Sequence, residues 1–141
     1  MLNLWKGGKM ILINKNDPVY SDERNGKILY LETFGESALM IISLGSHPCS
    51  YVTFPGIEHI SDYESANDLC DVHYGFTFLG SRENLGIKGI WLGWDYAHFG
   101  DLLYSSHFEL WEENEHKWTL DELIIEGRTA ITTINKKIKG V

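Results

Sequence analysis

The sequence predicts an α+β fold: a single domain in which a twisted, mainly antiparallel sheet is covered by a C-terminal helix. The chain has 141 residues, which is the size of one domain. Apolar residues make up 43% of it and aromatic residues 13%, which is ample material for a core and excludes disorder for most of the chain. Strand-forming segments come first and the strongest helical pattern comes last, an order typical of this class.

The first half of the chain predicts strands joined by short turns. Residues 1–9 are expected to form a loose leader. Asn25-Gly26 is a two-residue turn signal and predicts a hairpin centred on it. Residues 38–44 are almost continuously apolar and predict a buried central strand. We expect strands over residues 10–13, 27–34, 38–44 and 50–54.

The second half predicts two further strands after a short helix. Ser61 is a candidate N-cap for a helix over 61–69. Strands are expected over 71–79 and 88–96, with a polar loop over 80–86 between them. The register of this strand pair stays open, because a slip of one residue would turn every side chain to the other face.

The C-terminal segment, residues 119–139, has the clearest helical pattern. Thr119 and Glu122 have the spacing of a capping box. Gly127 weakens the middle of the helix. Apolar residues then recur at three- and four-residue spacing: Leu120, Leu123, Ile124, Ile131, Ile134 and Ile138.

Composition excludes several classes of protein. No run of 18 apolar residues is present, so we expect no membrane span. The N-terminus lacks the features of a signal peptide. Cys49 and Cys70 are too few for a disulfide scaffold and favour a reducing compartment. The sequence therefore predicts a cytoplasmic protein.

The net charge of −8 is distributed unevenly. Residues 61–126 carry 3 basic and 14 acidic side chains, whereas residues 127–141 carry 4 basic and no acidic ones. An acidic block of this kind repels phosphates and disfavours direct nucleic-acid binding through its surface. It suits a metal ion or a basic partner protein, although a merely solvated acidic face has the same composition.

The residues with most chemical potential lie between 71 and 101. Two imidazoles and carboxylates in this stretch could hold Zn²⁺, Mn²⁺ or Fe²⁺, or could exchange a proton as an acid/base pair. No established metal signature contains them, and a set of hydrogen bonds that locks a loop is the alternative. The candidate metal ligands are His73, Asp95, His98 and Asp101.

Two tryptophans extend this candidate site. Trp91 and Trp94 could stack on a planar ligand, although aromatic side chains of this kind are more often part of a core. No catalytic residue is assigned, and no cofactor is required. The residues expected to contact a ligand or partner are His73, Trp91, Trp94, Asp95, His98 and Asp101.

Three segments form a joint pattern: Cys49-x-Tyr51-Val52-x-x-Pro55, Asp71-Val72-His73-x-Gly75-x-Thr77-x-x-Gly80 and Trp91-x-Gly93-Trp94-Asp95-x-Ala97-His98-x-Gly100-Asp101. Together they resemble a family of small phage, prophage and bacterial proteins that has no established activity. The resemblance covers roughly residues 45–101 and the closing helix, and the loop at 80–88 is shorter here than in many members. It implies a phage or mobile-element origin and an accessory role in a host cell.

Three functions follow from these observations. The first is a non-enzymatic inhibitor that binds a host defence protein, as the acidic block and the resemblance suggest. The second is a sponge that sequesters a nucleotide immune signal, for which a homo-oligomer could supply Arg128 from a neighbouring subunit. The third is a metal-dependent hydrolase built on the His/Asp cluster. We expect the first.

Overall fold

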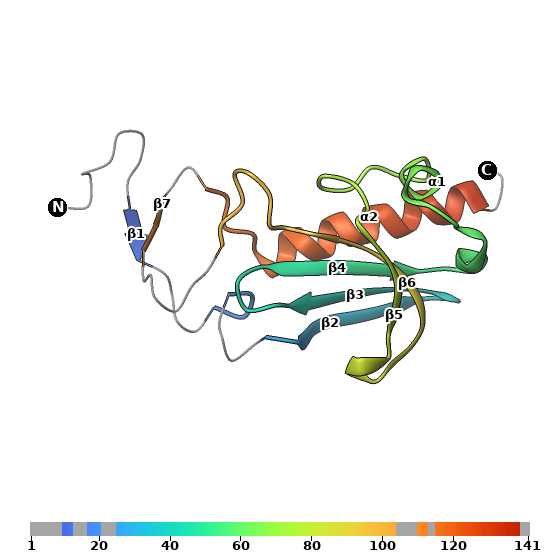
Figure 1. The fold of residues 1–141 in the computed structure, drawn as a ribbon, viewed down its shortest axis with the longest axis horizontal. Coiled ribbons are helices and arrows are strands. Elements are labelled where there is room, and N and C mark those ends of the chain that lie inside the picture. Colours follow the sequence, from blue (N-terminus) through green and yellow to red (C-terminus); the bar gives the residue numbers. More distant parts are fainter. Residues whose placement is uncertain (1–9, 13–16, 21–24, 104–109, 113–114, 139–141) are drawn as a thin grey trace.

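A computed structural model describes residues 10–12, 17–20, 25–103, 110–112 and 115–138. Its main element in this part of the chain is a five-stranded antiparallel sheet, and a long C-terminal helix runs along one face (Figure 1). The predicted α+β class is confirmed. The leader expected over residues 1–9 lies outside the described residues.

The strand order in the sheet is β2-β3-β4-β6-β5, so the chain leaves the sheet after β4 and returns to it at β5. All four pairings are antiparallel. Two short strands, β1 and β7, form a separate antiparallel pair. The strands are β1 (Met10–Leu12), β2 (Lys27–Phe34), β3 (Ser37–Ser43), β4 (Pro48–Thr53), β5 (Phe78–Arg82), β6 (Ile87–Asp95) and β7 (Leu110–Glu112).

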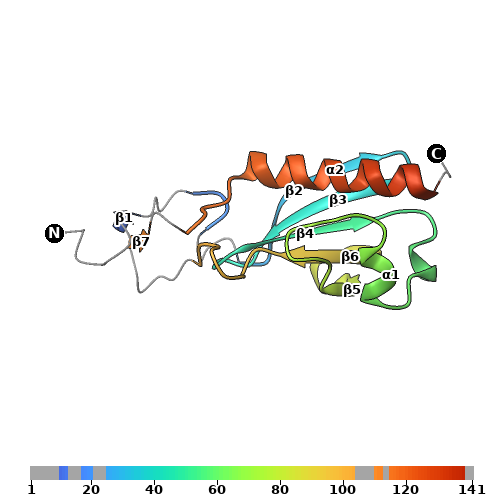
Figure 2. The same cartoon turned by 90° about the horizontal axis from the view of Figure 1, so that it is seen from above.

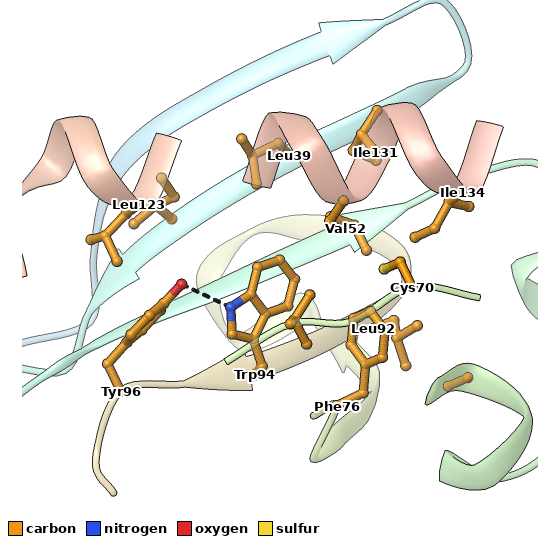
Figure 3. Packing of buried hydrophobic residues seen from close by; sticks show 14 of the residues in the cluster. Leu39, Val52, Cys70, Phe76, Leu92, Trp94, Tyr96, Leu123, Ile131 and Ile134 are labelled. Carbon is orange, nitrogen blue, oxygen red and sulfur yellow. Dashed lines mark hydrogen bonds between the residues drawn. The ribbon is translucent and has the colours of Figure 1, made fainter. Parts of the chain in front are cut away.

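Helix α2 (Leu120–Ile138) covers one face of the sheet as a second layer (Figure 2). Its Leu123, Ile131 and Ile134 point toward Leu39 and Val52 of the central strands (Figure 3). The buried stripe has the three- and four-residue spacing of an amphipathic helix, as the sequence predicts. The short helix α1 (Tyr63–Asn67) adds the buried Ala66 to the same core.

Gly127 brings the helix close to the sheet. A Cβ atom at this position would lie 2.4 Å from Cδ1 of Leu39. The glycine that weakens the helix in isolation therefore allows the close contact on which this core depends.

The opposite face of the sheet is also apolar and buried. Met40, Ile42 and Tyr51 are at most 2% exposed there and form a second core cluster with Trp91. Leu85, in the turn between β5 and β6, packs against this cluster. Both faces of the central strands are therefore inside the protein, which explains why β3 is apolar at almost every position.

The capping box of α2 is confirmed. The backbone N–H of Glu122 donates to Oγ1 of Thr119 at 3.2 Å, and the backbone N–H of Thr119 donates to Oε1 of Glu122 at 2.9 Å. None of the helices in the described part of the chain has the length and the apolar run that crossing a membrane requires.

The predicted hairpin turn and the predicted short helix are corrected. The two-residue hairpin turn lies at Gly35 and Glu36, which join Phe34 to its partner Ser37, whereas the turn at Asn25-Gly26 only leads into β2. Gly35 has the positive φ of 64° that such a turn requires. The short helix begins after Asp62, not Ser61, because the Asp62 carboxylate accepts the Ser65 N–H at 2.7 Å.

The predicted strand over 71–79 is wrong for most of its length. Residues 71–77 form a loop, and β5 begins only at Phe78 and takes in residues expected to lie in a loop. Tyr74 and Gly75 have consecutive positive φ angles of 58° and 81°, outside the β region, and turn the chain out of an extended conformation. Residues 71–77 therefore present no strand face, and the register left open by the sequence is that of β5 on β6, in which Phe78 pairs with Gly93.

Candidate functional site

The His/Asp cluster lies where β6 ends and α2 is about to begin. The loop after β6 carries His98 and Asp101, and the loop before β5 carries His73. A short parallel bridge between Asp101 and His116 ties the first loop to the segment that enters α2. The tertiary structure thus joins three separate segments of the chain at one place.

Asp101 is the centre of this cluster and is only 5% exposed. Its carboxylate accepts hydrogen bonds from His73 Nε2 at 2.8 Å, from Trp118 Nε1 at 2.9 Å and from the backbone N–H of His98 at 3.0 Å. These donors hold all three segments to one side chain. The loop-locking role that the sequence left as an alternative is therefore present.

The same contacts determine the ionisation of Asp101. Burial alone would raise the pKa of its carboxyl group, but the hydrogen bonds from Trp118, His73 and the His98 backbone outweigh burial and lower it. An ionised carboxylate only accepts hydrogen bonds, so the proton in the His73–Asp101 contact lies on Nε2 of His73.

Aromatic stacking fixes the two imidazole rings. His73 stacks on Tyr96 with ring centroids 4.9 Å apart, and His98 stacks on Tyr74 at 4.2 Å with an angle of only 3° between the planes. Trp118 meets His73 edge to face at 5.0 Å. The rings are therefore held in defined orientations before any ligand binds.

The side chain of His98 contains a buried nitrogen that lacks a hydrogen-bond partner among the described residues. Its Nδ1 is inaccessible to solvent and makes no hydrogen bond to any described residue. The nearest carboxylate oxygens lie 3.5 Å away on Asp95 and 3.8 Å away on Asp101. A buried polar atom without a partner is uncommon in folded proteins and calls for an explanation.

Asp95 lies at the edge of the cluster. One of its oxygens accepts the Ala97 backbone N–H at 3.0 Å, and the other is 3.4 Å from Oγ1 of Thr77. Of the four candidate ligands from the sequence, His73, His98 and Asp101 therefore meet directly, and Asp95 approaches them through His98.

Glu126 of α2 is a component that the sequence analysis did not select. It accepts hydrogen bonds from the His73 backbone N–H at 3.0 Å, from Trp94 Nε1 at 3.2 Å and from the Tyr96 hydroxyl. Burial, followed by the charge of Glu126, strongly raises the pKa of Tyr96. A sequence signal did exist, because Glu126 lies three residues after Leu123 and four before Ala130, on the buried stripe of the helix.

Trp91 and Trp94 do not lie at the surface of this site. Trp94 is 1% exposed in the core beneath α2, where its indole donates to Tyr96 (Figure 3). Trp91 is 4% exposed in the second core, on the opposite face of the sheet, and donates to the carbonyl of Lys88. Neither ring is accessible for stacking on a ligand, and both have the core position that the sequence left as the alternative.

A pocket of about 450 Å³ opens beside the cluster. His98 and Asp101 contribute to its wall, and Phe99, Leu103 and Glu115 complete most of it. Phe99 is 97% exposed and Leu103 52%, and Tyr74, stacked on His98, is 58% exposed. We call Tyr74, Phe99 and Leu103 the apolar rim.

A second, smaller pocket of about 220 Å³ is lined by Asp95. Arg82 borders it and packs over the rings of Tyr51 and Phe78, with its guanidinium carbon 4.9 Å and 4.4 Å from their centroids. Cys49 also lines it, but burial raises the pKa of this thiol to about 12. Cys49 is therefore a poor nucleophile.

The arrangement can do two things chemically. Its imidazole nitrogens and carboxylate oxygens are suitable ligands for a divalent transition metal. Its exposed apolar side chains, next to carboxylates, are suitable for contact with a partner.

Comparison with known proteins found no matching family model, no matching curated protein and no matching solved structure. The resemblance to phage proteins stays a prediction.

Proposed function

We propose that the protein is a phage or prophage accessory protein that counteracts host defence by binding a defence protein through the apolar rim. The observation that carries the proposal is the exposure of Tyr74, Phe99 and Leu103 at one pocket. Phe99 and Leu103 line this pocket, and Tyr74 contacts its wall by stacking on His98. Large apolar side chains gathered at a surface are typical of contact sites, whereas single ones are ordinary. Aromatic residues are also frequent among the side chains that dominate binding energy.

Strain in the backbone supports the same place. Among described residues other than glycine, Tyr74 alone has a positive φ. Holding a bulky residue there costs on the order of 1–2 kcal/mol, and such strain concentrates at functional sites. Stacking on His98 and a 3.1 Å hydrogen bond from the Tyr74 hydroxyl to the Phe99 carbonyl hold the ring beside Phe99. The rim is therefore preorganised on the Tyr74 side, which lowers the entropic cost of binding.

Charge indicates the chemistry of the partner. Asp101 and Glu115 line the same pocket as Phe99 and Leu103, and Asp95 lies 3.5 Å from His98 in its wall. Residues 61–126, which contain the whole rim, have a balance of −11. A basic protein surface complements this region and would be attracted to it at long range. Defence effectors that bind nucleic acid have basic grooves, which an acidic protein surface can occupy. The resemblance to phage proteins is the reason for placing the partner in host defence.

The proposal is tested by plating phages on host strains that each carry one defence system and express this protein. We expect the wild-type protein to raise plating at least tenfold on one strain and Phe99→Ala to abolish the gain. Phe99 is almost fully exposed, so its removal should leave folding intact. The matched control is Ile125→Ala, which removes an exposed apolar side chain from α2 and should keep full activity.

Binding is then measured with the purified defence protein of the responding strain. We expect the wild-type protein and Ile125→Ala to bind, with affinity that weakens as salt is added, and Phe99→Ala to bind at least tenfold more weakly. Unchanged plating on every strain, or a Phe99→Ala variant as active as the wild-type protein, would contradict the proposal.

A nucleotide signal fits this surface less well. The described residues that line the larger pocket include Asp101 and Glu115 but neither lysine nor arginine. Phosphates require positive charge or a metal ion at this place. The tryptophans expected to stack on a base are buried. Calorimetry with cyclic nucleotides and ADP-ribose derivatives separates the two functions, because only the sponge gives heat without a protein partner.

A further inference from the structure

We propose that His73, His98 and Asp101 form a binding site for one divalent transition-metal ion, with Zn²⁺ as its best representative. One potential ligand atom from each residue lies within 4.8 Å of the other two. Phe99 and Leu103 of the apolar rim supply no ligand, whereas Tyr74 contacts the site through its stacking on His98.

The distances between the ligand atoms suit a metal ion. His73 Nε2 lies 2.8 Å and His98 Nδ1 lies 3.8 Å from the same oxygen of Asp101. In a tetrahedral zinc site with bonds of 2.0–2.1 Å, ligand atoms are separated by about 3.3 Å. The two observed distances bracket this value, so small side-chain rotations bring the three atoms to bonding distance. When an ion binds Nε2 of His73, the proton on this nitrogen moves to Nδ1 of the same ring, which leaves the Nε2 lone pair free to coordinate.

The buried Nδ1 of His98 is the second observation, and it is independent of the spacing. This atom has no hydrogen-bond partner among the described residues, yet it lies between oxygens of Asp95 and Asp101 at 3.5 Å and 3.8 Å. Leaving a buried polar group unsatisfied costs about 1–3 kcal/mol. A cation between the imidazole nitrogen and the two carboxylates satisfies all of them at once.

The surroundings have the features that support metal ligands. Trp118 Nε1 and the His98 backbone N–H donate to Asp101 and fix its carboxylate. Tyr96 and Tyr74 fix the imidazole rings by stacking. Outer contacts of this type orient the ligands and increase affinity for the metal. Asp95, 3.5 Å from His98 Nδ1, is the available fourth ligand, either directly or through a water molecule.

The ligand set determines the class of ion. Two imidazoles with one or two carboxylates favour Zn²⁺, Mn²⁺, Fe²⁺ or Co²⁺. Mg²⁺ and Ca²⁺ prefer sites made of oxygen alone. Since the cysteines Cys49 and Cys70 are not in this group, no thiolate selects for Cu⁺ or an iron–sulfur cluster.

The experiment uses the full chain, freed of metal with a chelator, and titrates Zn²⁺ and Mg²⁺ in separate calorimetric runs. We expect one Zn²⁺ per chain, a higher melting temperature in its presence, and no response to Mg²⁺. Substitution of Co²⁺ should give the visible absorption of an ion in a nitrogen–oxygen site. His98→Ala should weaken Zn²⁺ binding at least tenfold and remove the thermal shift.

His59→Ala is the matched control, because His59 is an exposed histidine outside the cluster that pairs with Glu58. It should bind Zn²⁺ like the wild-type protein. Circular dichroism establishes that His98→Ala is folded. If it is not folded, Asp95→Asn, a change at the half-exposed edge of the cluster, should weaken binding in its place.

Failure of the wild-type protein to bind Zn²⁺ at micromolar concentration would overturn the proposal, as would unchanged binding by folded His98→Ala or an equal loss in His59→Ala. Neither result bears on defence inhibition, which is measured through Phe99→Ala. If Zn²⁺ binds, a hydrolase becomes testable with the loaded protein, because the 450 Å³ pocket has room for a substrate beside the ion.

Discussion

At the scale of single residues, Asp101 has the largest structural role in the candidate site. Three donors from three segments converge on its carboxylate, and the side chain is almost wholly buried. Sequence analysis selected Asp101 as a candidate ligand, but neither Trp118 nor Glu126 as a partner of the cluster. The reason is distance along the chain, since these contacts join residues 17 and 53 positions apart.

Asp101→Asn should destabilise the metal-free protein. Asparagine replaces one acceptor oxygen with an NH₂ group, which would face the N–H of Trp118 or of His98 and leave a buried donor without a partner. Loss of a hydrogen bond to a charged group costs about 1.5–3 kcal/mol. We expect a fall of this size in the free energy of unfolding, measured by urea denaturation in the presence of a chelator.

Asp71→Asn provides the control for this change. Asp71 is an exposed acid near the same loop, so its neutralisation should alter the free energy of unfolding by no more than about 0.5 kcal/mol. Equal stability of Asp101→Asn and Asp71→Asn would show that the carboxylate of Asp101 does not hold the loops together.

At the scale of elements, the contact between α2 and β3 depends on a missing side chain. A Cβ atom on Gly127 would approach Cδ1 and Cδ2 of Leu39 to 2.4 Å and 2.6 Å. Helical propensity, considered alone, would reward alanine at this position by about 1 kcal/mol. Packing opposes that gain, because Leu39 is fully buried and has little room to move.

Gly127→Ala should therefore lower the free energy of unfolding by about 1–3 kcal/mol, the usual cost of overpacking a core. The double variant Leu39→Ala/Gly127→Ala should recover part of this loss, since removal of the leucine branch frees the space. Thr132→Ala, at an exposed position of the same helix, should be neutral or slightly stabilising. A gain in stability from Gly127→Ala would mean that the helix lies farther from the sheet.

At the scale of the whole molecule, the sheet separates two cores of unequal size. The larger lies between the sheet and α2, and the smaller lies on the opposite face beneath the β5–β6 turn. Sequence analysis predicted one covered face, whereas successive residues of β3 are buried on both faces. The apolar run over 38–44 indicated this arrangement, because strands buried on both faces lack alternation.

Met40→Ala should test whether the smaller core contributes to global stability. Met40 and Leu39 are both fully buried, on opposite faces of β3. Truncation of a buried methionine or leucine costs about 2–5 kcal/mol. We expect both single variants to lose stability in this range in one cooperative urea transition. A loss below about 0.5 kcal/mol for Met40→Ala would indicate that the second face is hydrated.

The sequence by itself determined the fold class, the C-terminal helix and its capping box, and the central strands, because these depend on local periodicity and on contacts a few residues apart. It also selected His73, His98 and Asp101, whose chemistry is visible in residue type. Only the tertiary structure decided that these three meet while Trp91 and Trp94 are buried.

The physical reason is the range of the interactions. Positive φ angles at Tyr74 and Gly75 turn the segment before β5 out of the expected strand, and contacts with Asp101 and Glu126 hold it there. A conformation stabilised by residues 28 and 53 positions away leaves no periodic pattern in the segment itself. The uneven distribution of charge is visible in the sequence. Only the fold shows that Asp101 and Glu115 of the acidic block line one pocket with Phe99 and Leu103.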